Sequence, residues 1–416
     1  MEPNPPKAST ARSVLDRVKV LVPTGQDLAQ IAAATPLVPF SEPARAFVQR
    51  LSAAILGDIG FRPYPEMIAF AHWMRRARIQ ELAAEFDRRR NGAVWQGRGL
   101  AFHIAPANVD TIFLYSFMLS LLMGNANVVR LSSKRSAQVE AALALIDRIL
   151  GERGMEPVRA RLALVGYDHD DEITGALSAR CDLRVIWGGD ETVAAVRRLP
   201  LPPNARDLCF PHKWSVSVFD AAAYLGHNGK DELVRRYVND TYQFGQMACS
   251  SPRMMIWRGT AADCAAAGDD FWPLLERASA RFDTGLAAID FVNKRVAEDQ
   301  IAMARSVSVR QGAGNLVNVV RFSTLESLPL EEHCGAGLFY ECTIADLEPL
   351  RRFMGRRLQT VVSHGISKAE WTSFLAAGGV RGIDRIAAVG KALEFATVWD
   401  GHDLMREFIR EIAVDP

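Results

Sequence analysis

The sequence has no excess of charge of either sign, because its 49 lysines and arginines face 48 aspartates and glutamates over 416 residues. Such a balance gives no overall field that would attract nucleic acid or an anionic membrane surface. The sequence also lacks an apolar run of membrane-spanning length: the longest, residues 112–123, contains a tyrosine and two serines and falls short of the roughly 18 residues required. We therefore expect no nucleic-acid partner and no membrane insertion.

Cysteine is scarce, with six residues spread through the chain. The polar, proline-rich residues 1–17 lack the apolar stretch of a secretory signal, so we expect reduced thiols in a cytoplasmic protein. No pair of cysteines is spaced as CxxC, and the eight histidines form neither an HExxH nor a Cys/His cluster. The sequence therefore predicts no metal site.

The sequence does contain a regular alternation of β-rich runs and helix-like stretches between about residues 97 and 220. This alternation predicts a parallel sheet covered by helices, which binds ligands at the carboxyl ends of its strands. A standard GxGxxG is missing. The pattern divides the chain into a helical N-terminal segment (1–92), an α/β domain (93–222), a second α/β segment (223–380) and a C-terminal tail (381–416) with a helix over 402–412.

Residues 242–253 present a cysteine in a turn. Gly245 permits a sharp reversal after a predicted helix, and Cys249 follows among small residues before a predicted strand. Backbone N–H groups in such a turn can stabilise a thiolate or an oxyanion. The alternative is that Cys249 is a small buried hydrophobic residue. Arg253 could either lower the pKa of this thiol or form a structural salt bridge.

Two further features lie where predicted strands end. Asn108 follows the strand predicted at 99–104, where it could cap a helix or donate a hydrogen bond into a cleft. The strand predicted at 127–131 leads into a loop of hydroxyls and cations, 132–136. Such a loop suits a phosphate or a ribose, and a solvated charged surface is the alternative.

A pair of glycines, Gly188 and Gly189, follows the strand predicted at 183–187 and opens a helix. Glycine lets the backbone approach a pyrophosphate closely, although a Gly-Gly pair also marks a simple loop.

These features together resemble the aldehyde dehydrogenase superfamily, and within it the long-chain acyl-CoA reductase branch known from bacterial luminescence systems. The shared motifs are the strand followed by Pro-x-Asn, the Gly-Asn-x-Asn-Val-Val-Arg-Leu-Ser strand, the Gly-Gly-Asp-Glu-Thr turn and the Gln-x-Ala-Cys-Ser-Ser-Pro block, spread over about 94–401. The resemblance implies an α/β fold that is aldehyde-dehydrogenase-like. It comprises a helical N-terminal leader, a Rossmann-type cofactor domain over 93–222, an α/β catalytic domain over 223–380, and a tail that packs back or oligomerises.

The resemblance also implies roles for particular residues. Cys249 matches the catalytic nucleophile, and the side-chain amide of Asn108 with the Cys249 N–H matches the oxyanion hole. Glu332 matches the glutamate that holds the nicotinamide ribose, with a surface acidic pair as the alternative. The remaining matches are to cofactor-binding positions: Arg130, Ser132, Ser133, Lys134, Gly188 and Gly189.

The expected cofactor is NADPH. Ser133 stands where NAD-preferring members often carry a glutamate, and a serine beside Lys134 would accept the 2′-phosphate that a carboxylate repels.

One departure from the family pattern bears on the reaction. Aldehyde-oxidising members carry a glutamate that activates water, whereas the aligned segment here, 209–215, has none. We therefore expect NADPH-dependent reduction of an acyl thioester, of coenzyme A or a carrier protein, to an aldehyde through a covalent Cys249 thioester. The alternatives are aldehyde oxidation with His212 as the base, and a Cys249-based acyltransferase without reduction. The resemblance further implies a homo-oligomer and an acyl-activating partner enzyme.

Overall fold

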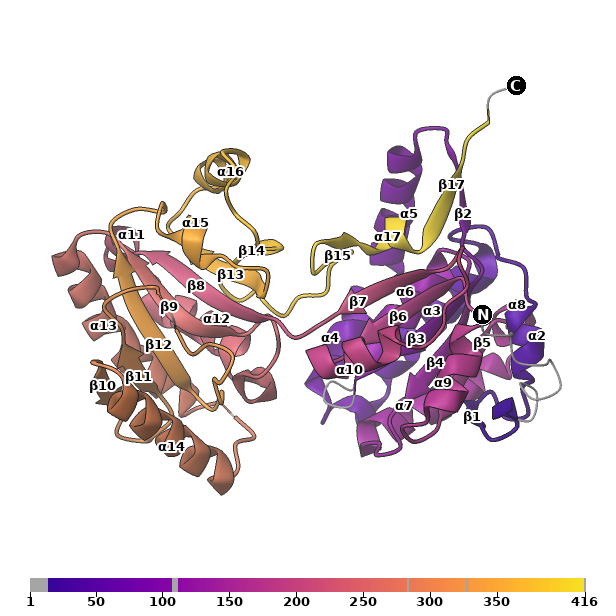
Figure 1. Cartoon of the computed structure of the whole chain (residues 1–416), viewed down its shortest axis with the longest axis horizontal. Coiled ribbons are helices and arrows are strands. Elements are labelled where there is room, and N and C mark those ends of the chain that lie inside the picture. Colours follow the sequence, from indigo (N-terminus) through magenta and orange to yellow (C-terminus); the bar gives the residue numbers. More distant parts are fainter. Residues whose placement is uncertain (1–13, 107–110, 283, 327, 415–416) are drawn as a thin grey trace, which may run out of the picture. The chain divides into compact units, whose positions relative to one another are not determined.

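The computed structural model describes residues 14–106, 111–282, 284–326 and 328–414 (Figure 1). The chain divides into two compact units, the first formed by residues up to Pro211 together with 395–416, and the second by residues 212–394. The predicted N-terminal segment thus shares one unit with residues 93–211 of the predicted cofactor domain and with the end of the tail, whereas residues 212–222 of the predicted cofactor domain belong to the second unit.

A six-stranded sheet, in the order β1-β5-β4-β3-β6-β7, forms the centre of the first unit. Five strands run parallel, and β1 pairs antiparallel at one edge. The strand order reverses at β3, which pairs with both β4 and β6, and ligands bind at the carboxyl ends of strands at such a reversal. The strands are β1 Lys19–Val22, β3 Leu100–Ile104, β4 Ala126–Leu131, β5 Leu162–Gly166, β6 Leu183–Trp187 and β7 Arg206–Phe210.

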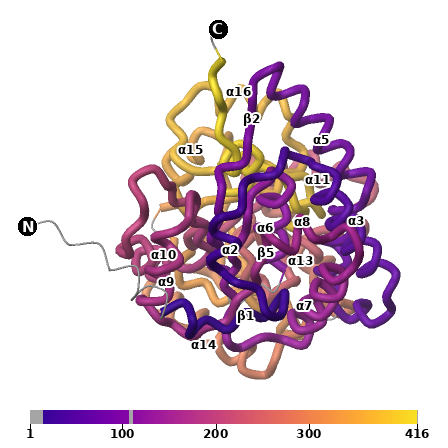
Figure 2. Tube along the Cα trace, turned by 90° about the vertical axis from the view of Figure 1, so that its right-hand side faces the viewer, coloured from indigo at the N-terminus to yellow at the C-terminus, as the bar shows by residue number. Residues whose placement is uncertain are grey.

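Helices connect the parallel strands, as the alternation in the sequence predicts. The helix α6 is buried along its whole length, so its apolar residues pack in the core of this unit. The described part of the N-terminal segment, residues 14–92, is mainly helical apart from β1, and α2 packs against β4 and β5 (Figure 2). The helices are α2 Leu28–Ala32, α3 Glu42–Gly57, η1 Ile59–Phe61, α4 Pro65–Trp73, α5 Arg76–Arg90, α6 Ile112–Leu122, α7 Ala137–Leu150, α8 Glu156–Arg159, α9 Asp171–Ser178 and α10 Asp190–Arg197.

The C-terminal segment completes the first unit in a way the sequence pattern does not predict. The helix expected over 402–412 is wrong: a short helix, α17 (Leu404–Glu407), is followed by a strand, β17 (Ile409–Ile412). This strand pairs antiparallel with β2 (Val94–Gly97), and the two lie side by side in Figure 1. Long-range pairing therefore overrides the local helical periodicity. The preceding residues also form a two-stranded pair, β15 Val398–Trp399 with β16 His402–Asp403.

The second unit contains a seven-stranded sheet in the order β10-β11-β12-β9-β8-β13-β14, parallel except for β10. Alternate residues of the central strands enter two apolar cores: Met255 and Trp257 of β9 pack with α11, α12 and α13, whereas Met254 and Ile256 pack with α14, α15 and α16. The strands are β8 Trp214–Asp220, β9 Pro252–Arg258, β10 Ser308–Gln311, β11 Asn318–Arg321, β12 Leu338–Ile344, β13 Leu358–His364 and β14 Arg385–Ala388. The helices are α11 Ala221–Leu225, α12 Lys230–Thr241, η2 Gln243–Gln246, α13 Ala261–Ser279, α14 Ala288–Ala304, α15 Leu350–Phe353 and α16 Lys368–Ala376.

Candidate functional site

Cys249 lies at the amino edge of the second sheet, three residues before β9. The turn η2 precedes it, and three consecutive residues there have left-handed backbone: Phe244 (φ 55°), Gly245 (φ 60°) and Gln246 (φ 68°). Glycine adopts this conformation readily, whereas phenylalanine and glutamine do so at a cost in free energy. Contacts around the turn must therefore hold its backbone in place.

Gln246 supplies two of these contacts. Its side chain is fully buried; Nε2 donates to the Pro252 carbonyl at 2.9 Å, and Oε1 accepts from the Gly337 N–H at 2.9 Å. The Ala336 N–H donates to the Gly245 carbonyl at 2.9 Å. The loop before β12 is thus bound to the turn that carries the cysteine.

Cys249 itself is held from β8. The Ser215 hydroxyl donates to the Cys249 carbonyl at 2.7 Å and accepts from the Thr360 N–H of β13 at 3.0 Å. The position of the Cys249 backbone is therefore set by two neighbouring strands. The thiol is half-buried, as expected of a residue that is both shielded and within reach of a reagent.

The loop before β12 is rigid in turn. His333 is buried, its Nδ1 accepts from the Gly335 N–H at 3.0 Å, and its Nε2–H donates to the Leu338 carbonyl at 2.9 Å. Burial, helped by the charge of Arg253, lowers the pKa of His333 to about 3, so the ring is neutral. Lys294 of α14, whose pKa burial lowers to about 8, donates to the Ala336 carbonyl at 2.8 Å.

Glu332 is exposed and, like Cys249, precedes a strand at the amino edge of this sheet. It lines a cavity of about 590 Å³ together with Trp214, Leu330 and Tyr340. Its neighbour Glu331 pairs with Arg357 at 2.5 Å, whereas Glu332 forms no ion pair within the described residues. Both glutamates line this cavity, and of the two only Glu331 forms an ion pair within the described residues.

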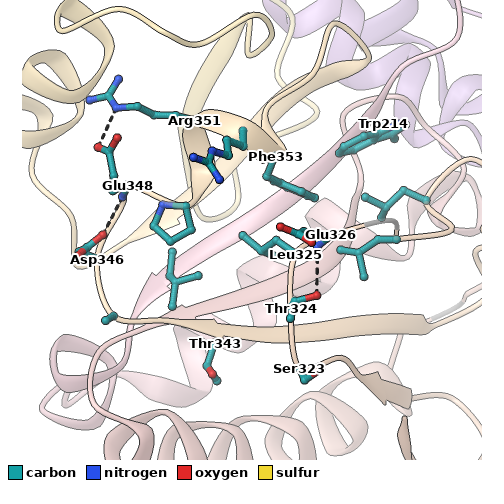
Figure 3. Close-up of a pocket in the computed structure, with 16 residues that line it drawn as sticks. Trp214, Ser323, Thr324, Leu325, Glu326, Thr343, Asp346, Glu348, Arg351 and Phe353 are labelled. Atoms are coloured by element: carbon teal, nitrogen blue, oxygen red, sulfur yellow. Dashed lines mark hydrogen bonds and ion pairs between the residues drawn. The ribbon is translucent and has the colours of Figure 1, made fainter. Parts of the chain in front are cut away.

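A second hollow, of about 1220 Å³, shares Trp214, Leu328 and Leu330 with this cavity and extends to α15 (Figure 3). Leu325 and Phe353 face each other within it, and Arg351 is joined to Glu348 at its rim at 2.8 Å (Figure 3). Because Trp214 adjoins Ser215, this groove begins next to the strand that holds Cys249.

In the first unit, the predicted cofactor residues gather after β4. Arg130 is half-buried with its guanidinium 5.2 Å from the centre of the Tyr167 ring, and its Nη2 donates to the Tyr167 carbonyl at 3.4 Å. Arg135 pairs with Glu140 at 2.6 Å. Ser133 and Lys134 are exposed. The Ser132 hydroxyl accepts a hydrogen bond from the Lys134 backbone N–H.

The Gly188–Gly189 turn follows β6, next to the reversal of strand order at β3. Trp187, just before the turn, stacks on Phe210 with the ring centres 3.7 Å apart. Its Nε1–H donates to the Ser116 hydroxyl at 3.1 Å, and Ser116 donates to His103 Nδ1 at 2.7 Å. A hydrogen-bonded chain therefore fixes the strand end from which the turn departs.

The two glycines have different surroundings. A Cβ at Gly188 would meet the Thr192 side chain at 3.0 Å, whereas one at Gly189 would meet nothing within 4 Å. The first turn of α10 carries Asp190 and Glu191, which already complement the positive end of the helix dipole. This turn therefore offers a ligand open backbone at Gly189 rather than a vacant anion site.

Asn108, the predicted oxyanion-hole residue, lies outside the described residues. The structure brings Cys249 and Glu332 to one sheet edge in the second unit, and the 130–134 segment and the glycine turn to one sheet edge in the first. Sequence reasoning missed Gln246, Ser215 and Lys294 as residues that hold the site. The adjacent Gly245 and Gln246 in the predicted turn could have indicated the role of Gln246. Ser215 and Lys294 act through contacts with residues far away in the sequence, which no local pattern indicates.

The segment without the hydrolytic glutamate spans both units. Cys209 is half-buried in β7, where burial raises the pKa of its thiol, and His212 is half-buried at the start of the second unit. Across the described ranges, no three His, Cys, Asp or Glu side chains are placed to hold a metal ion. In the same part of the chain, no helix has the length and apolar character to cross a membrane.

Comparisons with known proteins agree with this architecture. A model of the acyl-CoA reductase (LuxC) family matches residues 79–265. The long-chain acyl-protein thioester reductase of Aliivibrio fischeri is 24% identical over 168 residues, which are 39% of this chain and 33% of that protein. The match thus spans a third of this relative's length.

Solved structures of aldehyde dehydrogenases share the fold. The NAD-dependent benzaldehyde dehydrogenase of Corynebacterium glutamicum has a TM-score of 0.61 at 15% identity, covering 92% of this chain and 86% of its own. The lactaldehyde dehydrogenase of Escherichia coli has a TM-score of 0.60 at 13% identity, covering 98% and 91%. The predicted fold class is therefore confirmed.

Proposed function

We propose that this chain, which has the fold of aldehyde dehydrogenases and matches the acyl-CoA reductase family model over residues 79–265, reduces an acyl thioester to an aldehyde through a covalent intermediate on Cys249. The observation that carries the proposal is the Cys249 turn. A half-buried thiol follows a left-handed backbone turn that hydrogen bonds of Gln246, Ser215 and Ala336 hold in place. Such organisation is typical of a nucleophile and unnecessary for a packing residue.

In the first half of the proposed reaction, the Cys249 thiolate attacks the carbonyl carbon of the thioester. The Asn108 amide and the Cys249 N–H donate to the oxyanion as it forms. The carbon–sulfur bond to the carrier then breaks, and the carrier thiol, with a pKa near 8.5, leaves without an acid catalyst. The acyl group remains as a thioester of Cys249.

In the second half, the thioester carbon would be reduced by hydride, which is the chemistry that a nicotinamide cofactor would supply when bound. The chain contributes an oxyanion site for the resulting hemithioacetal, and collapse of this species releases the aldehyde and restores the Cys249 thiolate. No glutamate occupies the segment where oxidising relatives activate water, which favours transfer over hydrolysis.

The residues present fit a nicotinamide cofactor. The reversal of strand order at β3 provides the crevice at which such sheets bind nucleotides, and Gly189 leaves its backbone open at that edge. Ser133 and Lys134 are exposed after β4, and Lys134 forms no ion pair within the described residues. We propose NADPH as the cofactor, with Arg130 and Ser132 at its adenosine end, Gly188 and Gly189 along it, and Glu332 at the nicotinamide ribose.

Intact-mass analysis after incubation with a panel of acyl-CoA and acyl-carrier-protein thioesters tests the proposal. We expect one acyl adduct in the wild type and in Cys334→Ala, which removes another half-buried thiol, and none in Cys249→Ala. An adduct that survives in Cys249→Ala contradicts the proposal. Release of free acid from an aldehyde without a thiol acceptor would favour oxidation, and failure to bind NADPH would favour an acyltransferase.

The proposal includes a cytoplasmic homo-oligomer that works with an acyl-activating partner enzyme. Sedimentation equilibrium at micromolar concentration checks the first part, and a mass near the 45.9 kDa of one chain would contradict it.

A further inference from the structure

The guanidinium of Arg253 is a buried cation without a carboxylate partner. The residue is 1% exposed on β9, four positions after Cys249. Its Nη1 donates to the Leu330 carbonyl at 2.7 Å, and its Nε and Nη2 have no hydrogen-bond partner among the described residues. The structural salt bridge considered from the sequence is absent from this part of the chain.

A buried charge of this kind needs compensation. Burying a cation costs several kcal/mol unless an anion or enough hydrogen-bond acceptors surround it. The other fully buried arginine, Arg184, meets this requirement with a bidentate pair to Asp207 at 2.7 and 3.0 Å. Among the described residues Arg253 has no such carboxylate, so the N–H groups of its Nε and Nη2 are left for a different anion.

Two acidic groups interact with this guanidinium: the thiol of Cys249 and the hydroxyl of Tyr340. Burial lowers the pKa of Arg253, and these two groups act in the opposite direction, with Cys249 the larger. Burial raises the pKa of Tyr340 to a value far from neutrality, so its hydroxyl keeps its proton. Cys249 is therefore the neighbour that can carry negative charge.

The remaining titratable groups around this position do not supply that charge. His333 is neutral, and burial raises the pKa of Cys334. Glu332 and Arg305 act on Tyr340 with opposite signs, and neither pairs with Arg253.

We propose that Arg253 is the buried counter-cation of the Cys249 thiolate, which keeps this thiol ionised and ready to attack the thioester. The inference rests on the proposed nucleophilic role of Cys249. The Leu330 carbonyl orients the guanidinium from one side, and the Cys249 thiolate, which accepts no hydrogen bond from Arg253 in the structure, is stabilised by the charge of the guanidinium. When the sulfur becomes acylated its charge disappears, so the same cation is then available to favour return of the thiolate when the aldehyde leaves.

The rate of Cys249 alkylation by iodoacetamide between pH 5 and pH 10, followed by peptide mass spectrometry, tests the proposal without substrate or cofactor. We expect a midpoint at least one pH unit below the ordinary thiol value of about 8.5. Arg253→Met should return the midpoint to that value and slow alkylation at pH 7 by about tenfold, and Arg253→Lys should restore most of the wild-type rate.

Arg258→Gln is the matched control, because Arg258 lies on the same strand and is paired with Asp220 at 2.6 Å. It should leave the midpoint unchanged. A wild-type midpoint near 8.5, or equal midpoints in wild type and Arg253→Met, would overturn the inference. If Arg253→Met does not fold, the midpoint of alkylation in the wild type and in Arg253→Lys still tests the inference. A low midpoint without any acyl adduct would refute the proposed function and leave the thiolate pairing intact.

Discussion

The carboxamide of Gln246 joins the turn before Cys249 to Gly337 in the loop before β12, with 2.9 Å between Oε1 and the glycine nitrogen. Its other end holds the Pro252 carbonyl at 2.9 Å. One fully buried side chain therefore connects both ends of the cysteine turn to a second loop.

Gln246→Met should remove both bonds and leave two buried backbone groups without partners. Each such group costs about 1–3 kcal/mol, so we expect the free energy of unfolding to fall by about 2–6 kcal/mol and acylation of Cys249 to slow. Urea unfolding and adduct formation measure the two effects. Gln243→Met, in the same turn, makes a matched control because its side chain is half-buried and forms no hydrogen bond with another described residue. Equal losses in both variants would contradict the role of Gln246.

Gly335→Ala should damage the same region through the backbone. Gly335 has φ 73°, and an added Cβ would clash with the Gly245 carbonyl and lie 2.9 Å from the Met247 sulfur. We expect a loss of about 2–4 kcal/mol in unfolding free energy. In Gly314→Ala the new Cβ would meet nothing nearer than 3.9 Å, so its change should stay within about 0.5 kcal/mol. Thermal unfolding of the pair checks this, and equal stabilities would refute it.

Ser133→Glu should change the preference between the two nicotinamide cofactors. A carboxylate at this exposed position would repel the 2′-phosphate, so we expect KM for NADPH to rise by about tenfold or more while KM for NADH changes little. Lys134→Ala should act in the same direction, and Lys368→Ala, an exposed lysine of the second unit, should have no effect. An unchanged ratio of the two constants in Ser133→Glu would contradict the proposed NADPH preference.

His103 should make the protein less stable in mild acid. Burial lowers its pKa to about 4, against about 6.5 in the unfolded chain, and Asn127 accepts from its Nε2 at 3.0 Å. Between these values the unfolded state binds the proton and the folded state does not, so stability falls as pH drops from 6.5 to 4, by about 3 kcal/mol. His103→Gln should flatten this part of the pH profile of thermal unfolding. His333 adds a similar loss in the second unit, so a wild-type profile that is level from pH 7 to pH 4 would refute the assignment.

The sequence predicts those strands and turns whose formation depends on residues close together in the chain. The strands predicted at 99–104, 127–131 and 183–187 follow from the local alternation, and they match the structure within a residue. The Cys249 turn could be recognised because glycine, small residues and the thiol are adjacent in sequence. The tail could not, because β17 exists through its pairing with β2, more than three hundred residues earlier.

The same distinction applies to the site. Nothing near Ser215 in sequence indicates that its hydroxyl holds the Cys249 carbonyl, and nothing near Lys294 indicates its bond to the loop before β12. The absence of a carboxylate beside Arg253 is likewise a property of the folded core. Such contacts join residues tens of positions apart, which periodicity and composition do not relate.

The return of residues 395–416 to the first unit means that the second unit is an insertion within the first. The core of the first unit includes four buried residues of this segment: Leu404, Met405, Phe408 and Ile409. A fragment ending at Pro211 would therefore expose that core and lack β17. During synthesis the first unit therefore cannot finish folding until residues 395–414 have left the ribosome, whereas the second unit, whose residues are contiguous, can fold before them. The first unit is thus completed after the unit that is inserted in it.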